Sequence, residues 1–122
     1  MSLAELRADL KESLESVGIK AFEYLPERVQ PPIALITPSD PYVEQGSTYT
    51  LFDIGLTVTL ITAKATNPVA TAALDELIEN AIIATGDWLI DKVGAPFLLE
   101  ANNAQFLAAR LTLTQQIEIG GS

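Results

Sequence analysis

The acidic residues that could do chemistry in this chain gather in one segment, where Asp75, Glu76 and Glu79 lie close together. Asp75 and Glu79 are four residues apart, so a helix would place both carboxylates on the same face. Carboxylate oxygens are the ligands that Mg²⁺ and Ca²⁺ prefer. However, no ligand set of matching spacing occurs elsewhere, and the exposed face of an amphipathic helix is usually charged. We therefore expect a solvated helix face and no metal, and we interpret Asp87 and Asp91 in the same way.

The residues needed for nucleophilic and zinc chemistry are missing. The chain has no cysteine and no histidine among its 122 residues. This excludes thiol nucleophiles, Ser–His and Cys–His pairs and the common zinc ligand sets. The seven glycines form neither a phosphate-binding loop nor a dinucleotide-binding fingerprint. We therefore expect no enzyme, no catalytic residue and no cofactor.

The charge balance is acidic, because 16 aspartates and glutamates against seven lysines and arginines give a formal net charge of −9. Nucleic-acid affinity comes largely from clustered Lys and Arg, and the basic residues here are scattered along the chain. Lys64 follows one predicted strand, and Arg110 lies on the polar face of another. Since no nucleophile accompanies either residue, we expect a cross-strand ion pair or a contact to another subunit.

The hydrophobic content of 48% predicts a folded domain rather than a disordered chain. A membrane span needs about 20 consecutive apolar residues. The longest uncharged run, residues 29–39, has 11 residues and contains three prolines. We therefore expect no membrane partner.

Two segments have the apolar spacing of amphipathic helices. In residues 3–17, leucines recur every three or four residues after a capping box at Ser2 and Glu5, and Gly18 is suited to end the helix. The second segment covers about 68–91, with Asn67 as the N-cap and Pro68 in the first turn. Its apolar stripe includes Ala70, Leu74, Leu77, Ala81, Thr85 and Trp88.

Alternation of apolar and polar residues predicts strands between and after these helices. The long strands cover 53–64 and 106–119. Shorter strands are expected at 20–24, 33–36 and 97–101, and turns at 38–41 and 102–103. The predicted architecture is α+β, a single mainly antiparallel sheet with two amphipathic helices packed on one face. Its length predicts a single domain over residues 1–122.

Residues 42–52 ("YVEQGSTYTLF") are polar, contain a glycine and carry three aromatic side chains. They predict a long loop or a hairpin arm. Aromatic residues on loops are common at protein interfaces, and Tyr42, Tyr49 and Phe52 would fit that role. The alternative is that these side chains lie back on their own domain.

Five of the seven prolines lie in "YLPERVQPPIALITPSDPY", residues 24–42. With the long alternating strand and the segment "TNPVATAALDELIENAI" that follow, this stretch resembles small tail proteins of long-tailed bacteriophages. The resemblance is greatest to the tail terminator (tail-completion) proteins of phages that infect actinobacteria. The residues that carry it are Tyr24, Leu25, Pro26, Arg28, Pro31, Pro32, Pro38, Asp40, Pro41, Tyr42, Asn67 and the run 73–77.

The resemblance implies a structural protein of the virion tail that is assembled in the cytoplasm of the bacterial host. Six copies would form a ring that caps the tail tube, ends its polymerisation and joins the tail to the neck. The implied partners are other copies of the chain, the tail tube protein and a neck or head-completion protein. DNA would pass through the ring without sequence-specific binding. Another phage connector or neck completion protein is an alternative, and so is a small-ligand binding module.

A ring requires contacts between unlike surfaces of neighbouring subunits. In this hypothesis the prolines stiffen the connector around strand 33–36, so that the arm at 42–52 projects at a set angle towards a neighbour. The candidate contact residues are Tyr42, Val43, Glu44, Tyr49 and Phe52 of the arm, together with Lys64 and Arg110.

Overall fold

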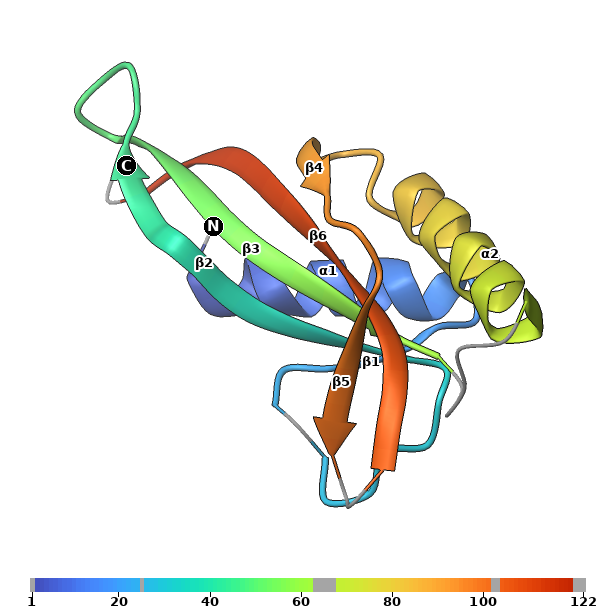
Figure 1. Cartoon of the computed structure of the whole chain (residues 1–122). Helices are drawn as coiled ribbons and strands as arrows, with labels where there is room; N and C mark the ends of the chain where they lie inside the picture. Colours follow the sequence, from blue (N-terminus) through green and yellow to red (C-terminus); the bar gives the residue numbers. More distant parts are fainter. Residues whose placement is uncertain (1, 25, 63–67, 102–103, 120–122) are drawn as a thin grey trace.

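The computed structural model describes residues 2–24, 26–62, 68–101 and 104–119. Within these residues, one mixed sheet of six strands carries two helices, which confirms the predicted α+β class (Figure 1). The elements in chain order are α1 (Leu3–Ser16), β1 (Lys20–Phe22), β2 (Ile33–Gln45), β3 (Leu51–Ile61), α2 (Pro68–Ala84), β4 (Leu89–Val93), β5 (Phe97–Ala101) and β6 (Ala104–Glu118).

The strand order in the sheet is β1-β2-β3-β6-β4. β5 lies outside this order and pairs with residues 104–108 at the start of β6, whereas β4 pairs with residues 111–114. β1 runs parallel to β2, whereas the other strand pairs are antiparallel. The centre of the sheet is the pairing of β3 with β6, which runs from Leu51 opposite Glu118 to Ile61 opposite Ala108. The predicted mainly antiparallel sheet is therefore confirmed.

Both helices pack on the same face of the sheet, as predicted. Helix α1 begins after Ser2, whose hydroxyl accepts a hydrogen bond of 3.1 Å from the Glu5 amide and donates one of 3.2 Å to the Glu5 carboxylate, so the structure shows the Ser2 half of the predicted capping box. Gly18 follows its end with a φ of 85°, in the left-handed region that favours glycine. The shared core contains buried side chains from both helices and from the central strands. They include Leu6, Leu10, Leu14, Leu74, Leu77, Ala81, Ile54, Leu56, Val58, Leu111 and Leu113.

The opposite face carries no helix from the described residues, and we call it the helix-free face. At the end of the sheet near β5, Ile33, Ile61, Phe106 and Ala108 form a smaller buried cluster there. Many other side chains of this face on the central strands are polar. Its side chains come from register positions such as Thr57 opposite Thr112, Thr59 opposite Arg110 and Gly55 opposite Thr114.

The second helix is shorter than predicted, since α2 ends at Ala84 and β4 begins at Leu89. The Thr85 hydroxyl donates a hydrogen bond of 2.8 Å to the Ala81 carbonyl, and the Trp88 amide donates one of 2.9 Å to the Thr85 carbonyl. These bonds close a turn that contains Gly86. Trp88 packs against the core from this turn rather than from a helix. The helical prediction for 85–91 was therefore wrong.

The predicted turn at 38–41 was also wrong, because these residues lie inside β2. The register between β2 and β3 shifts between Pro38 and Val43, which marks a bulge. Among the described strands, β1 pairs only with residues 33–35 of β2, so the rest of β2 forms an edge of the sheet. Proline is tolerated at an edge because its missing N–H group is not needed there.

The arm predicted at 42–52 is a hairpin rather than a loop. Residues 42–45 continue β2, residues 51 and 52 begin β3, and residues 46–50 form the turn between them. We call residues 46–50 the tip. Figure 1 shows the hairpin reaching away from both helices, with the tip at its far end. Strands β5 and β6 pair as the predicted second hairpin, whereas its turn at 102–103 lies outside the described residues.

Candidate functional site

The tip presents one aromatic side chain to solvent. Tyr49 is 96% exposed. The turn around it is held by backbone bonds, from the Gly46 amide to the Leu51 carbonyl at 2.8 Å and from the Leu51 amide to the Thr48 carbonyl at 3.2 Å. The Gln45 side chain donates a further bond of 2.6 Å to the Thr48 carbonyl. An ordered turn therefore holds Tyr49 away from the rest of its own domain.

The other two aromatic residues of the arm lie back on the domain. The Arg7 guanidinium of α1 donates a hydrogen bond of 2.6 Å to the Tyr42 hydroxyl and one of 2.9 Å to Glu23. The bond to Glu23 raises the pKa of Arg7 above its ordinary value, although partial burial acts in the opposite direction. Phe52 is half-buried and packs against the core on the helix side. Of the three aromatics, Tyr49 alone has the exposure of a contact residue.

The remaining candidates of the arm are exposed. Val43 has 40% of its surface exposed. Glu44 lines a shallow depression of about 130 Å³, together with Asp40, Asp53 and Asp91. Asp91 accepts a hydrogen bond of 2.8 Å from the Thr114 hydroxyl. Among the described residues, no three carboxylates are arranged to hold a metal ion, and the carboxylates of α2 at positions 75, 76 and 79 are exposed.

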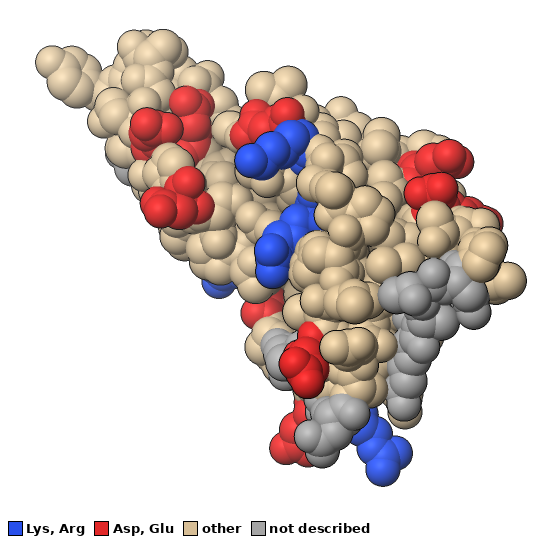
Figure 2. All heavy atoms as spheres, in the orientation of Figure 1, with Lys and Arg blue, Asp and Glu red and all other residues tan. Residues whose placement is uncertain are grey.

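Of the two basic candidates, Arg110 and Lys64, the structure describes Arg110. Arg110 is exposed on the helix-free face, and its guanidinium carbon lies 4.4 Å from the centre of the Phe97 ring. This is a cation–π contact to the adjacent strand, and in the described part of the chain Arg110 forms no ion pair. Lys64 lies outside the described residues. Figure 2 shows acidic side chains over the hairpin half of the helix-free face and basic side chains nearer its middle.

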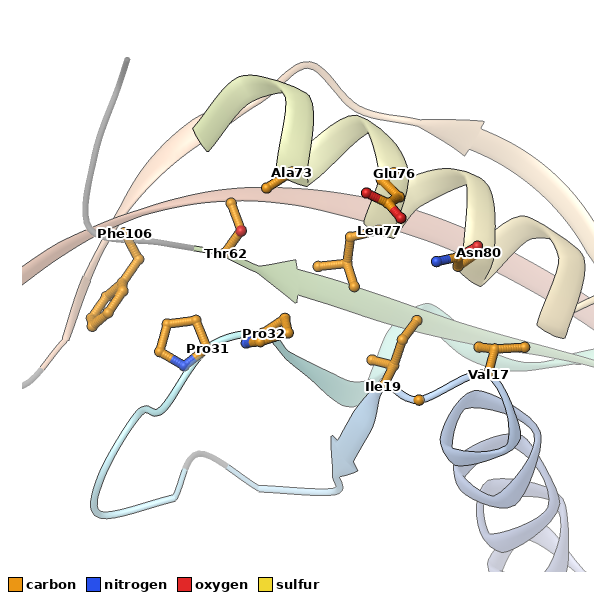
Figure 3. Close-up of a pocket in the computed structure, with 11 residues that line it drawn as sticks. Val17, Ile19, Pro31, Pro32, Thr62, Ala73, Glu76, Leu77, Asn80 and Phe106 are labelled. Atoms are coloured by element: carbon orange, nitrogen blue, oxygen red, sulfur yellow. The ribbon is translucent and has the colours of Figure 1, made fainter. Parts of the chain in front are cut away.

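A groove of about 560 Å³ opens between the end of α1, helix α2 and the connector before β2 (Figure 3). Ile19 and Leu77 point into it from opposite sides, and Phe106 closes one end. The rings of Pro31 and Pro32 add apolar wall. The polar lining is supplied by Thr62, Glu76 and Asn80.

Sequence reasoning did not find this groove. Its lining comes from segments that are far apart in the chain, so no local spacing marks it. The sequence feature that could have pointed to the groove is the pair Pro31 and Pro32, which lies immediately before β2 and forms part of the groove wall.

Further exposed apolar side chains lie near the point where α2 ends and β4 begins. Ile83 and Ile82 of α2 are 72% and 39% exposed, and Leu89 and Val93 of β4 are 68% and 37% exposed. Leu89 lies opposite Thr114, on the helix-free face, whereas α2 covers the other face of the sheet. Because β4 is an edge strand, its exposed side chains are open to a partner. In Figure 1 the start of β4 and the end of α2 lie away from the tip.

No family model matches the chain, and no curated protein matches it in sequence. Neither helix, among the residues that the structure describes, has the length and apolar character needed to cross a bilayer.

Proposed function

We propose that the chain is a structural subunit of a phage tail and forms a six-membered ring that caps the tail tube. The observation that carries the proposal is the exposure of apolar side chains at separate places, with Tyr49 on the tip, Ile83 at the end of α2 and Leu89 at the start of β4. Tyrosine and other aromatic side chains are enriched at protein interfaces. Unlike surfaces can pair head to tail between copies, and a rotation that closes gives a ring.

The free edge of β2 is protected against open-ended strand pairing between copies, and this protection supports a closed assembly. Unpaired strand edges invite other chains to add strands, and proline, charge and bulges are the usual protection. The edge carries Pro38 and Pro41 within a bulge, with Asp40 and Glu44 exposed beside them. Copies are thus expected to meet through side chains rather than through open-ended strand pairing.

The resemblance supplies the remaining partners of the proposed ring. One rim would bind the tail tube protein and end its polymerisation, and the other would bind a neck or head-completion protein in the virion. Six copies of a chain with a net charge of −9 would carry −54, six times that value. Like charges repel DNA, so an acidic ring suits DNA that passes through without sequence-specific binding.

The native mass, measured across a wide concentration range with and without magnesium, tests the proposal. We expect a species of about 79 kDa, six times the 13.1 kDa of the chain. Addition of this species to polymerising tail tube protein should shorten the tubes. A neck completion protein would also form a ring but would leave tube length unchanged. A tight dimer with a two-fold interface would contradict the proposal, because its contact would be self-complementary.

A small-ligand binding module is the second candidate, and the groove favours it. Its volume of about 560 Å³ falls within the range of about 300–1,000 Å³ typical of ligand pockets. This candidate predicts a stable monomer whose melting temperature rises with a ligand that fills the groove. Thermal-shift screening of the monomer distinguishes it from the ring.

A further inference from the structure

We propose that the tip of one subunit seats in the groove of the next, with Tyr49 as its central contact. This inference rests on the proposed ring and specifies one contact between its subunits. It assigns an occupant to the groove, namely a second copy of this chain.

The topology places the tip and the groove at opposite ends of one hairpin. The tip joins Gln45 of β2 to Leu51 of β3, whereas the groove is lined by Pro32, just before β2, and by Thr62, just after β3. β3 has 11 residues, and a strand rises by about 3.3 Å per residue, so the two sites lie about 35 Å apart. A subunit therefore cannot fill its own groove. Each copy offers one tip and one groove, which is the requirement for head-to-tail contact.

The chemistry of the two surfaces is complementary. Residues 45–52 carry no charge, and the tip offers the hydroxyl groups of Ser47, Thr48, Tyr49 and Thr50. The groove has apolar walls and a single charged group in its described lining, the carboxylate of Glu76. The aromatic side chain of Tyr49 fits such walls, and its phenol O–H can donate a hydrogen bond to the Glu76 carboxylate. An acidic segment would be repelled there, so in this acidic chain an uncharged tip is a suitable occupant.

The size and the order of the tip also fit. A tyrosine buries about 150–250 Å² when it is enclosed, and the groove has room for the Tyr49 side chain and part of the turn that carries it. The hydrogen bonds within the tip reduce the entropy lost on binding. A contact this small falls below the roughly 800 Å² per partner of a standard interface. A single contact is therefore weak, and the ring is stabilised because each closed subunit makes two contacts.

Disulfide trapping tests the contact cleanly, because the chain has no cysteine of its own. Thr48→Cys, which leaves Tyr49 in place, and Asn80→Cys are introduced into separate copies that carry tags of different size. Thr48 is an exposed residue of the tip, next to Tyr49. A disulfide needs Cβ atoms about 3.5–4.5 Å apart, and the distance along the hairpin prevents a link within one subunit. The matched control pairs Thr48→Cys with Glu100→Cys, because Glu100 is exposed on β5 and lies outside the groove.

We expect the 48–80 mixture to form the mixed dimer about tenfold faster than the 48–100 control, because a bound tip has a high effective concentration. A chain carrying both Thr48→Cys and Asn80→Cys should give a ladder of linked species that ends at six. Adding Tyr49→Ser to the Thr48→Cys copy should slow the 48–80 link to the rate of the control. Circular dichroism of each variant checks that it is folded.

The other outcomes separate the contact from the ring. If the 48–80 link forms no faster than the control, the contact is overturned, and the native mass then reports independently whether a ring forms by another surface. If Thr48→Cys alone gives as much dimer as the mixture, a tip-to-tip contact replaces the proposed one. A ladder that continues beyond six supports the contact but contradicts the six-membered ring.

Discussion

Gly55 lies beneath the bulge of β2, and its replacement by alanine tests how that bulge is positioned. A Cβ atom at this position would lie 2.7 Å from the Pro41 carbonyl oxygen and 3.1 Å from the Ser39 Cβ atom. Real Cβ atoms essentially never make contacts below 3.0 Å. The neighbour at 2.7 Å is backbone, which cannot move aside as the end of a long side chain can. In Gly55→Ala the bulge must therefore shift.

Overpacking of this kind costs about 1–3 kcal/mol. At a urea m-value of about 2 kcal/mol/M, a loss of about 2 kcal/mol lowers the unfolding midpoint by about 1 M. Urea unfolding of the monomer, followed by circular dichroism, measures this shift. The m-value should stay unchanged if the substitution acts on the native state alone.

Gly86→Ala is the matched control, since the nearest atom to an added Cβ there is the Ile83 carbonyl oxygen at an ordinary 3.6 Å. Its free energy of unfolding should change by no more than the roughly ±0.5 kcal/mol typical of surface substitutions. Equal midpoints for Gly55→Ala and Gly86→Ala would refute the steric account of the bulge. Because the bulge sets the course of the hairpin, Gly55→Ala should also slow the proposed 48–80 disulfide link, whereas Gly86→Ala should not.

Four further predictions concern stability and assembly. Tyr49→Ser should change the free energy of unfolding by less than about 0.5 kcal/mol while lowering the native mass at a given concentration, as measured by light scattering. Tyr42→Phe removes the hydrogen bond to Arg7 and should cost about 1 kcal/mol in urea unfolding, with the native mass unchanged; the reverse pattern would show that Tyr42 is the contact residue. Leu14→Ala, in the fully buried stripe of α1, should cost about 2–5 kcal/mol in the same assay, and a smaller loss would mean that α1 packs loosely on the sheet. Glu23→Gln should cost well under 1 kcal/mol, because exposed ion pairs contribute little, and high salt should remove the difference from the unsubstituted chain.

Local signals predicted most elements of the fold because those elements are specified locally. The leucine stripe between Ser2 and Gly18 and the alternation in β3 and β6 need no distant partner to be recognised. The end of α2 could not be found in this way. The turn after α2 places Trp88 against the core, at a sequence position where a longer helix would also have placed an apolar residue. The apolar spacing of the sequence therefore continued past the true end of the helix. Likewise, 38–41 has the composition of a turn, and only the sheet order reveals that it lies on a free strand edge.

The candidate site was less predictable because side-chain exposure depends on partners far away in the chain. Tyr42 and Tyr49 have the same chemistry and lie seven residues apart. Tyr42 is turned towards the domain by Arg7, which is 35 residues away, and no property of the arm itself signals this. The groove combines α1, α2 and the strand ends, so it exists only once the helices are packed.

Four prolines of residues 24–42 lie in two separate structural settings, and the stiffening of a projecting arm by the prolines stays a prediction. Pro38 and Pro41 lie on the free edge of β2, where a strand from another chain would otherwise add. Pro31 and Pro32 form part of the groove wall, where the tip of another copy is proposed to bind. Pro38 and Pro41 thus oppose a contact between copies through the backbone, whereas Pro31 and Pro32 support the proposed contact through side chains. If both roles hold, the proline stretch selects between two ways of joining copies, and the selected way has the head-to-tail geometry that a closed ring requires.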